Sequence, residues 1–228
     1  YRFFVKKDQI QEDAVIIIGS DVNHIKNVLR MKKGETILIS DGEDREYVCT
    51  IDELENEQVR AKIEDVNGVE LPIKVTLFQA LPKGDKMETV IQKMIELGAY
   101  EIVPVFTKRC IVKLDNKKAV SKTKRWNSIA ESAAKQSKRG IIPKVSMPVT
   151  YKEALKMAEA MDMVLIPYEN AENMAHTRQV VSQIKTGMTV GIFIGPEGGF
   201  AEEEVEQAIN TGAYDITLGK RILRTETA

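Results

Sequence analysis

The first part of the chain alternates short apolar stretches with turn-forming residues. The stretches cover residues 14–18, 35–40, 46–51 and 58–63, and Asp-Gly, Glu-Asn and similar pairs separate them. This spacing is typical of short strands joined by turns. Residues 21–30 interrupt the strands with apolar residues at helical spacing, and Asp21 is the expected N-cap. Residues 1–71 are therefore predicted to form a small β-barrel domain with one short helix.

After residue 72 the pattern changes to alternating strands and helices. Strands are predicted at residues 74–80, 101–106, 162–167, 189–194 and 214–218. Amphipathic spacing predicts helices at residues 85–97, 121–139, 151–160, 171–185 and 202–210. Asp85 and Glu88 have the spacing of a capping box, and Gly98 is expected to end that helix. The alternation predicts an α/β domain over residues 72–228, with a parallel sheet that binds ligands beyond the carboxyl ends of its strands.

Composition narrows the class of protein. Hydrophobic residues make up 43% of the 228 residues and charged residues 29%, as in soluble globular proteins. No apolar run is long enough for a membrane span, and we expect no signal peptide. Cys49 and Cys110 stand far apart, which fits the reducing cytoplasm better than a disulfide scaffold. With His24 and His176 as the only histidines, we expect neither a metal site nor a Ser-His-Asp triad.

The net charge of −1 conceals a strongly basic segment. Between Lys108 and Lys144 there are twelve lysines and arginines, and the only acidic residues are Asp115 and Glu131. The positive charges in this segment repel one another unless an anion compensates them. The segment therefore favours a polyanion-binding surface. A solvated helix face is the alternative interpretation.

Three loops follow the late strands and are predicted to meet at one edge of the sheet. They cover residues 165–170, 195–199 and 219–228. The second reads Gly-Pro-Glu-Gly-Gly and matches neither the P-loop nor the G-x-G-x-x-G fingerprint of dinucleotide-binding proteins. A tight turn between strand and helix remains the alternative to a ligand-binding loop.

The helix after this glycine loop begins with three carboxylates, Glu202, Glu203 and Glu204. A helix N-terminus ordinarily attracts anions, but a phosphate here would meet like charge. A ligand without phosphate and with a cationic centre would be favoured. S-adenosylmethionine, which carries a sulfonium group, fits this description, although the three carboxylates exclude phosphate ligands better than they identify one cofactor.

Several sequence runs resemble one known family. They are Leu81-Pro-Lys-Gly-Asp-Lys-Met-Glu88, Glu96-Leu-Gly98, Ile194-Gly-Pro-Glu-Gly-Gly-Phe200, Leu218-Gly-Lys-Arg-Ile-Leu-Arg-Thr-Glu-Thr-Ala228 and, nearer the start, His24-Ile-Lys-Asn-Val-Leu-Arg30. In this order, and over nearly the whole chain, they are similar to the RsmE family of bacterial 16S ribosomal RNA uridine-N3 methyltransferases of the SPOUT class.

The resemblance implies a PUA-like β-barrel for residues 1–71, followed by a SPOUT domain for residues 72–228. It further implies a C-terminal trefoil knot and a homodimer. The family continues with a helix after the T-E-T-A run, and both that helix and an initiator Met are missing here, so we expect a trimmed chain.

The resemblance also implies where S-adenosylmethionine binds. Its expected contacts come from segments at the three late loops. They are Leu165, Ile166, Pro167, Tyr168, Ile194, Gly195, Pro196, Glu197, Gly198, Gly199, Leu218, Gly219, Arg221, Ile222 and Leu223.

Methylation at N3 of a uridine requires loss of the N3 proton, and hence a base or a cation that stabilises the deprotonated ring. Arg221 and Arg224 are expected to bind the uracil oxygens or a flanking phosphate through their planar guanidinium groups. A salt bridge to a neighbouring acid is their alternative role. The candidate bases are Glu197, Glu169 and Glu226, and Glu226 is preferred because it follows the arginines. Each carboxylate has a purely structural alternative.

N3 lies on the Watson–Crick edge, so the target uridine must be unpaired. Basic residues are expected to contact the ribosomal RNA of the small subunit: Arg2, His24, Arg30, Lys83, Lys86, Arg109, Lys138 and Arg139. The main alternative is a non-catalytic RNA-binding or ribosome-assembly module on the same fold. A nicotinamide oxidoreductase is a weaker one, since the dinucleotide fingerprint is absent.

Overall fold

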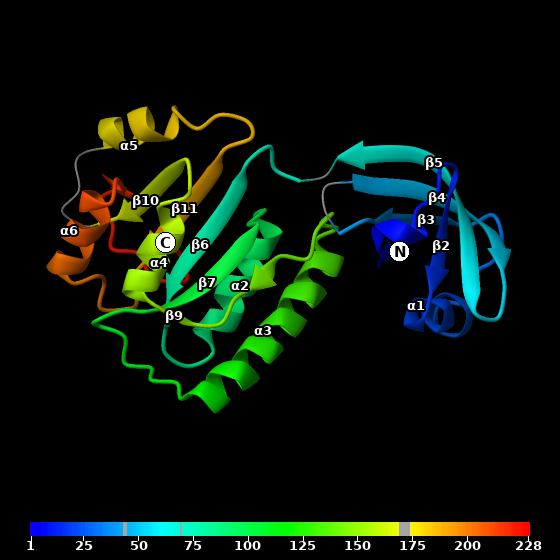
Figure 1. Cartoon of the computed structure of the whole chain (residues 1–228), viewed down its shortest axis with the longest axis horizontal. Coiled ribbons are helices and arrows are strands. Elements are labelled where there is room, and N and C mark those ends of the chain that lie inside the picture. The colour runs from blue at the N-terminus through cyan, green and yellow to red at the C-terminus, as the bar shows by residue number, and fades with distance from the viewer. Residues whose placement is uncertain (43–44, 69, 169–173) are drawn as a thin grey trace. The chain divides into compact units, whose positions relative to one another are not determined.

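The computed structural model describes residues 1–42, 45–68, 70–168 and 174–228, and these residues form two compact units (Figure 1). Unit 1 comprises Tyr1–Glu70 and Ala134–Ile142, and unit 2 comprises Leu71–Ala133 and Pro143–Ala228. The predicted boundary after residue 71 differs from the first division by one residue. Hydrophobic periodicity does not predict that residues 134–142 join unit 1.

Unit 1 is built on a five-stranded sheet of order β1-β3-β4-β5-β2. Its strands are β1 (Arg2–Phe4), β2 (Ala14–Ile18), β3 (Thr36–Ser40), β4 (Arg45–Leu54) and β5 (Gln58–Gly68). β1 lies parallel to β3, and the other neighbours are antiparallel. Among the residues that the structure describes, β1 and β2 form the two edges of the sheet. All five strands contribute side chains to one hydrophobic core, and among the described residues no pairing of β1 with β2 closes the sheet into the predicted barrel.

A short helical segment joins β2 to β3. It consists of α1 (Ser20–Asn23) and a π-helical turn, η2 (His24–Val28). The helix starts after Gly19, its N-cap, which has a φ of 76°. Asp21 lies inside the helix, so the prediction that it is the N-cap is wrong. Val22 and Ile25 are buried in the core of unit 1, as their helical spacing predicted.

Glu70 attaches the segment Ala134–Ile142 to the rest of unit 1. Its carboxylate accepts hydrogen bonds from Nε of Arg139, at 3.0 Å for Oε1 and 2.9 Å for Oε2. Oε1 also accepts from the backbone N–H groups of Gly140 at 2.7 Å and Ile141 at 3.2 Å. One buried ion pair and two backbone donors therefore hold the returning segment in place.

Unit 2 contains a parallel sheet of order β12-β10-β11-β6-β7-β8, and β9 also pairs with β7. The strands are β6 (Lys74–Ala80), β7 (Glu101–Phe106), β8 (Lys144–Val145), β9 (Val149–Thr150), β10 (Met163–Pro167), β11 (Thr189–Ile194) and β12 (Tyr214–Ile216). This confirms the predicted α/β class with a parallel sheet.

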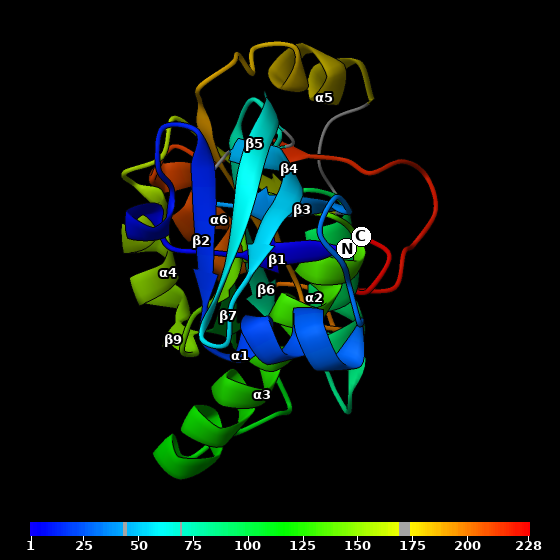
Figure 2. The same ribbon diagram turned by 90° about the vertical axis from the view of Figure 1, so that its right-hand side faces the viewer.

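Helices cover this sheet (Figures 1 and 2). They are α2 (Lys86–Glu96), α3 (Asn116–Gln136), α4 (Tyr151–Ala158), α5 (Met174–Val181) and α6 (Glu202–Asn210). Residues of α4 and α6 pack with Phe78 and Phe193, whose rings stack at 4.4 Å, whereas α5 packs against a separate cluster around Leu165. No helix in the described ranges is both long and apolar enough to cross a membrane.

The helix caps differ from one prediction. Asp85 precedes α2 but makes no side-chain capping hydrogen bond, and Glu88 pairs instead with Arg125 at 2.8 Å. A capping box forms at α4, where Thr150 and Glu153 satisfy each other's backbone N–H groups. The predicted capping box of α2 is therefore wrong, because an arginine from α3 competes for the Glu88 carboxylate.

Candidate active site

A pocket of about 750 Å³ lies beyond the carboxyl ends of β10, β11 and β12. The loops after these strands line it, as the parallel topology predicted. All predicted cofactor-binding residues line this pocket except Leu165 and Ile166. The other lining residues are Lys86, Arg109, Phe200, Thr217, Lys220, Arg224, Thr225 and Ala228.

Leu165 and Ile166 lie within β10 and are core residues. Their exposed fractions are 4% and 0%, and they belong to two different hydrophobic clusters of the sheet. Their side chains therefore do not line the pocket, which corrects the prediction for these two residues. Among the described residues of this loop, Pro167, the last residue of β10, and Tyr168 line the pocket.

The glycine loop, residues 195–199, is held by two side chains from other parts of unit 2. Its Gly195 carbonyl accepts from Oγ1 of Thr225 at 2.6 Å, and its Gly198 carbonyl accepts from Nη1 of Arg109 at 2.8 Å. A β-carbon added at Gly195 would lie 3.2 Å from the backbone of Gly199. The loop is therefore preformed and so tightly folded that a side chain at Gly195 would strain it.

Glu197 points toward the start of α2. Its Oε1 accepts from the backbone N–H of Lys83 at 3.1 Å and pairs with Nζ of Lys86 at 3.1 Å. Burial by itself would raise the pKa of Glu197, but hydrogen bonds from its own backbone, from Lys86 and from Lys83 outweigh it and lower this pKa. Glu197 is therefore an ionised carboxylate with a defined cation beside it.

The C-terminal segment, residues 217–228, leaves β12 as a wide loop, drawn in red in Figure 2, and then returns to the sheet. Ile222 in the middle of the loop is 96% exposed, whereas Thr225 is buried. Thr225 Oγ1 accepts from Nε2 of Gln79 at 3.0 Å and donates to the Gly195 carbonyl. Thr225 thus attaches the segment to both β6 and the glycine loop.

The predicted catalytic residues lie on this segment. Arg221 and Arg224 line the pocket and are exposed, with 83% of the Arg224 side chain accessible. Glu226 is only 20% exposed, and its carboxylate lies 3.4 Å from Nζ of Lys86 and 4.0 Å from Nη1 of Arg224. The two guanidinium groups are therefore accessible to a substrate, whereas Glu226 is already paired. Glu169, the third candidate base, lies outside the described residues.

The three glutamates at the start of α6 do not line the pocket. Glu204 is buried, and its carboxylate accepts from the backbone N–H groups of Lys108 at 2.8 Å and Ala201 at 2.9 Å. Glu203 pairs with Lys108 at 3.2 Å. Among the described residues, the charged side chains that line the pocket are Glu197 and five cations: Lys86, Arg109, Lys220, Arg221 and Arg224. Contrary to the prediction, Glu202, Glu203 and Glu204 therefore do not keep a phosphate out of this pocket.

The predicted RNA-binding residues separate by exposure. His24, Arg30, Lys83 and Lys138 are exposed, and Lys86 and Arg109 line the pocket. Arg2 and Arg139 are buried, with 4% and 6% of their side chains accessible, in ion pairs with Glu46 and Glu70. Those two residues stabilise unit 1, and their predicted role in RNA binding is corrected.

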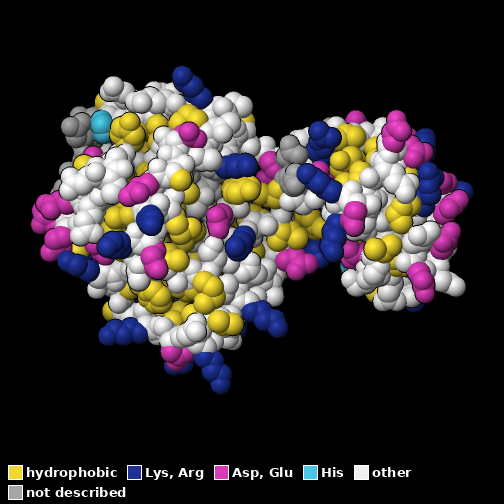
Figure 3. Space-filling model, in the orientation of Figure 1, with side chains coloured by type: hydrophobic (Ala, Val, Ile, Leu, Met, Phe, Trp, Pro, Cys, Tyr) yellow, Lys and Arg dark blue, Asp and Glu magenta, His cyan; other side chains and the backbone are white. Residues whose placement is uncertain are grey.

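The basic segment between Lys108 and Lys144 is partly exposed. Lys117, Lys118 and Lys124 on α3 are accessible. Figure 3 shows lysine and arginine side chains projecting from the lower edge of unit 2, where Figure 1 places the beginning of α3. This surface could contact a polyanion, and that role stays a prediction.

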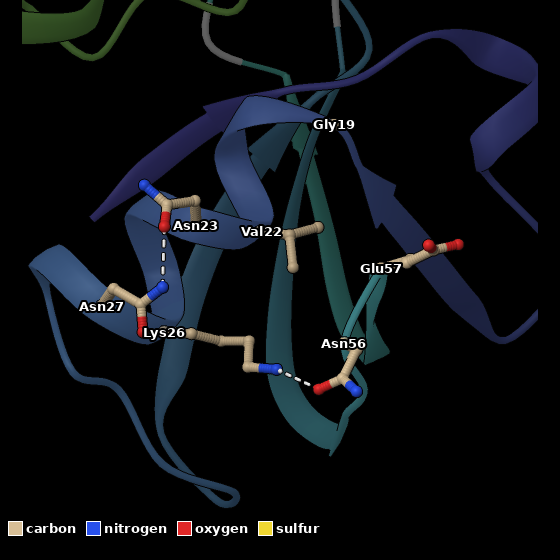
Figure 4. A pocket seen from close by; sticks show the side chains of 7 residues that line it. All are labelled: Gly19, Val22, Asn23, Lys26, Asn27, Asn56 and Glu57. Atoms are coloured by element: carbon tan, nitrogen blue, oxygen red, sulfur yellow. Dashed lines mark hydrogen bonds between the residues drawn. The ribbon is translucent and has the colours of Figure 1, made fainter.

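A smaller pocket, of about 470 Å³, lies in unit 1 (Figure 4). Its lining includes the amides of Asn23, Asn27 and Asn56 together with the side chain of Lys26. Lys26 Nζ donates to the carbonyl of Glu55 at 2.6 Å and approaches Oδ1 of Asn56 at 3.4 Å. This polar pocket is flanked in sequence by His24, one of the exposed candidates for RNA contact.

Sequence reasoning missed Gln79 and Thr225, and the pairing of Lys86 with two carboxylates. A signal for Gln79 existed, because it is the one polar residue in the apolar run Leu77-Phe-Gln-Ala80. Buried polar side chains in strands usually have a specific partner. No group of three or more histidines, cysteines or acidic residues that could hold a metal ion occurs in the part of the chain that the structure describes.

Comparison with known proteins agrees with this geometry. The profile of the RNA methyltransferase domain family matches residues 69–228, and that of the RNA methyltransferase PUA domain matches residues 17–64. The ribosomal RNA small subunit methyltransferase E of Bacillus subtilis (strain 168) is 37% identical over 235 residues, which cover 100% of this chain and 92% of the relative.

Two solved structures are similar over the whole fold. One is the ribosomal RNA small subunit methyltransferase E of Neisseria gonorrhoeae bound to S-adenosyl methionine, with 34% identity, a TM-score of 0.79, and coverage of 100% of this chain and 92% of that chain. The other is a methyltransferase of Legionella pneumophila in complex with bound SAM, with 32% identity, a TM-score of 0.74, and coverage of 99% and 92%. On these matches and the arrangement of its pocket, the chain belongs to the ribosomal RNA small subunit methyltransferase E family.

Proposed function

We propose that this protein transfers a methyl group from S-adenosylmethionine to N3 of a uridine in the 16S RNA of the small ribosomal subunit. The observation that carries the proposal is the preformed pocket of three loops at the carboxyl edge of the parallel sheet. The Neisseria gonorrhoeae relative, which is similar over the whole chain, is described with S-adenosyl methionine bound.

The residues of the pocket fit this cofactor. The glycine loop offers backbone N–H and C=O groups without side chains, so a flat adenine ring and a ribose can approach them closely. Among the described lining residues Glu197 is the carboxylate, and Lys86 already pairs with it at 3.1 Å, so the fit to the cofactor rests on the backbone groups of the glycine loop. Bound S-adenosylmethionine would supply an electrophilic methyl group next to a positively charged sulfur.

The exposed arginines fit the substrate. Arg221 and Arg224 present planar donors that can bind the O2 and O4 oxygens of uracil or a flanking phosphate. Bound to the ring oxygens, they would stabilise the negative charge that develops when N3 loses its proton. Glu226 and Glu197 are the candidate bases among the described residues, and Glu226 is closest in sequence to the arginines.

Four features of the assembly belong to the same proposal. The uridine is presented unpaired, with RNA contacts from His24, Arg30, Lys83 and Lys138. The C-terminal segment forms a trefoil knot, which the resemblance to the SPOUT class implies. The enzyme is a cytoplasmic homodimer. Its partner is the small ribosomal subunit or its RNA.

The test is direct detection of the product. Full-length protein, S-adenosylmethionine and 16S RNA or small subunits from cells that lack the enzyme are incubated, and digested nucleosides are analysed by mass spectrometry. We expect N3-methyluridine to appear at one position. A protein that binds RNA and S-adenosylmethionine but forms no methylated uridine in either substrate would contradict the proposal.

Arg224→Ala tests the predicted catalytic role. We expect kcat to fall on the order of 100-fold, because one preorganised donor to the developing charge is lost. The Kd for S-adenosylmethionine, measured by calorimetry, should stay within about threefold, because this exposed side chain is assigned to the uridine. Arg178→Ala, which removes an exposed arginine from α5, is the control for lost charge. Wild-type turnover in Arg224→Ala would remove Arg224 from the mechanism.

A further inference from the structure

Lys86 is the first residue of α2, and its side chain lies between two carboxylates. Its Nζ is 3.1 Å from Oε1 of Glu197 and 3.4 Å from Oε2 of Glu226. Glu197 belongs to the glycine loop and Glu226 to the C-terminal segment, so one ammonium group joins two of the three segments that line the pocket. This contact differs from the RNA contact that the sequence predicts for Lys86.

The Lys86 ammonium group compensates a buried carboxylate oxygen of Glu226. Oε2 of Glu226 is inaccessible to water, and a buried carboxylate oxygen is costly unless a cation or donor compensates it. The hydrogen bond to Glu197 is the largest cause that raises the pKa of Lys86, so this side chain stays protonated through the neutral range. The bridge is therefore a permanent charge pairing at neutral pH.

Glu226 extends the restraint to Arg224, whose Nη1 lies 4.0 Å from Oε1 of Glu226. The Arg224 carbonyl accepts from the backbone N–H groups of Thr227 at 2.8 Å and Ala228 at 3.0 Å, which closes a turn over residues 224–228. Thr225, inside this turn, is attached to the Gly195 carbonyl at 2.6 Å. The exposed guanidinium of Arg224 therefore projects from a turn that is fixed at Thr225 and at Glu226.

We propose that Lys86 is a positioning residue that holds this turn against the glycine loop and thereby sets where Arg224 meets the uridine. The inference rests on the proposed function, since Arg224 has a catalytic role only if a uridine is methylated. It also assigns Glu226 a structural part in the site, as the carboxylate through which Lys86 acts on Arg224. A lysine that served mainly as an RNA contact would instead need its ammonium group for a phosphate.

Lys86→Met and Lys86→Arg test this role in the full-length protein. For Lys86→Met we expect kcat to fall on the order of 100-fold. Loss of the bridge should shift the turn that carries Arg224, and a misplacement of about 1 Å is enough for a loss of this size. The Kd for RNA and the salt dependence of RNA binding should change little. Lys86→Arg keeps the charge and should restore kcat to within a few-fold of wild type. Lys93→Met is the matched control, since Lys93 lies on the same helix and pairs only locally with Glu96 at 2.8 Å.

A double-mutant cycle tests the route through Glu226. If Lys86 acts through this carboxylate, Lys86→Met and Glu226→Gln will not be additive, and the double variant will be about as slow as the slower single variant. Fully additive losses in kcat would overturn this route. A raised KM for RNA with unchanged kcat in Lys86→Met would return Lys86 to the RNA contacts and overturn the proposal.

Hydrogen exchange separates this inference from the proposed function. The N–H groups of Thr227 and Ala228 are hydrogen-bonded within the turn, so they should exchange faster in Lys86→Met than in wild type or Lys93→Met. If wild-type protein methylates no uridine, the proposed function fails while the exchange rates still test the bridge. Unchanged exchange in Lys86→Met would overturn the bridge even in an active enzyme.

Discussion

Gly195 illustrates how the backbone of a single residue limits the site. A β-carbon at this position would lie 3.2 Å from the Gly199 backbone and 3.3 Å from the Phe200 nitrogen, and neither can move as a side chain does. Gly195→Ala is therefore expected to open the loop and weaken S-adenosylmethionine binding by about tenfold or more, the effect of overpacking a tight contact. Calorimetry with full-length protein measures this loss.

Gly198→Ala is the matched comparison at the same scale. Its β-carbon would meet only Arg109 side-chain atoms, at 3.6 and 3.7 Å, which is ordinary van der Waals contact. The Kd should then rise by no more than about threefold, since nothing is overpacked. Equal losses in both variants would show that the close approach at Gly195 does not limit the loop.

Single residues also mark where sequence reasoning succeeded and failed. The alternation of strands and helices predicted that the loops containing Pro196, Arg221 and Leu223 would meet at one edge of the sheet, because parallel strands bring their following loops together, whereas the resemblance implied their individual contacts with the cofactor. The structural role of the Glu204 carboxylate could not be predicted from the order of strands and helices. Its carboxylate is bound by the backbone N–H of Lys108, a partner distant in the sequence.

At the scale of elements, hydrophobic periodicity predicted the long strands and helices well. The predicted limits of β6, β11 and α6 agree with the structure, because each has an uninterrupted apolar run or helical stripe. β8 and β9 were missed, since each has only two residues and exists through pairing with β7. α3 begins at Asn116, earlier than predicted, because its first turn carries charged residues with no apolar period.

The junction between β10 and β11 provides a prediction about pH. Asp162 accepts from the backbone N–H of Thr189 at 2.8 Å and from its hydroxyl at 2.7 Å, and these bonds lower the pKa of Asp162. A carboxyl group with a lowered pKa stabilises the fold above its unfolded pKa, and this stabilisation is lost as the pH falls through the lower, folded value. Asp162→Asn should therefore lower Tm at pH 7, and the difference from wild type should shrink in acid.

Thermal unfolding of both proteins between pH 7 and pH 3 checks this expectation. Glu159→Gln is the control, because Glu159 is also acidic, exposed and close in sequence. A difference in Tm between wild type and Asp162→Asn that stays constant over the whole range would mean that the charge of Asp162 does not stabilise this junction.

At the scale of the whole molecule, the features that could not be predicted are those that depend on contacts between residues far apart in the sequence. Composition and periodicity separated a β-rich first part from an α/β second part, and the two units follow this division except for Ala134–Ile142. Glu70 and Arg139 are 69 residues apart, and nothing in their local sequence marks them as partners. Because of this contact Arg139, which the sequence predicts to bind RNA, is instead part of a buried ion pair with Glu70.

Lys138 and Arg139 therefore give adjacent, opposite tests of how the protein binds RNA. Lys138 is exposed, so Lys138→Gln should weaken RNA binding at low salt and reduce the slope of log K against log salt by about 0.7, the value for one phosphate contact with a single strand. Its Tm should match wild type.

Arg139→Gln leaves the Glu70 carboxylate without its buried cation, which should destabilise unit 1 by about 3 to 5 kcal/mol. Titrations of 16S RNA fragments at several salt concentrations, together with thermal unfolding, measure both effects. A salt slope that is reduced by Arg139→Gln at full stability, and not by Lys138→Gln, would reverse these assignments.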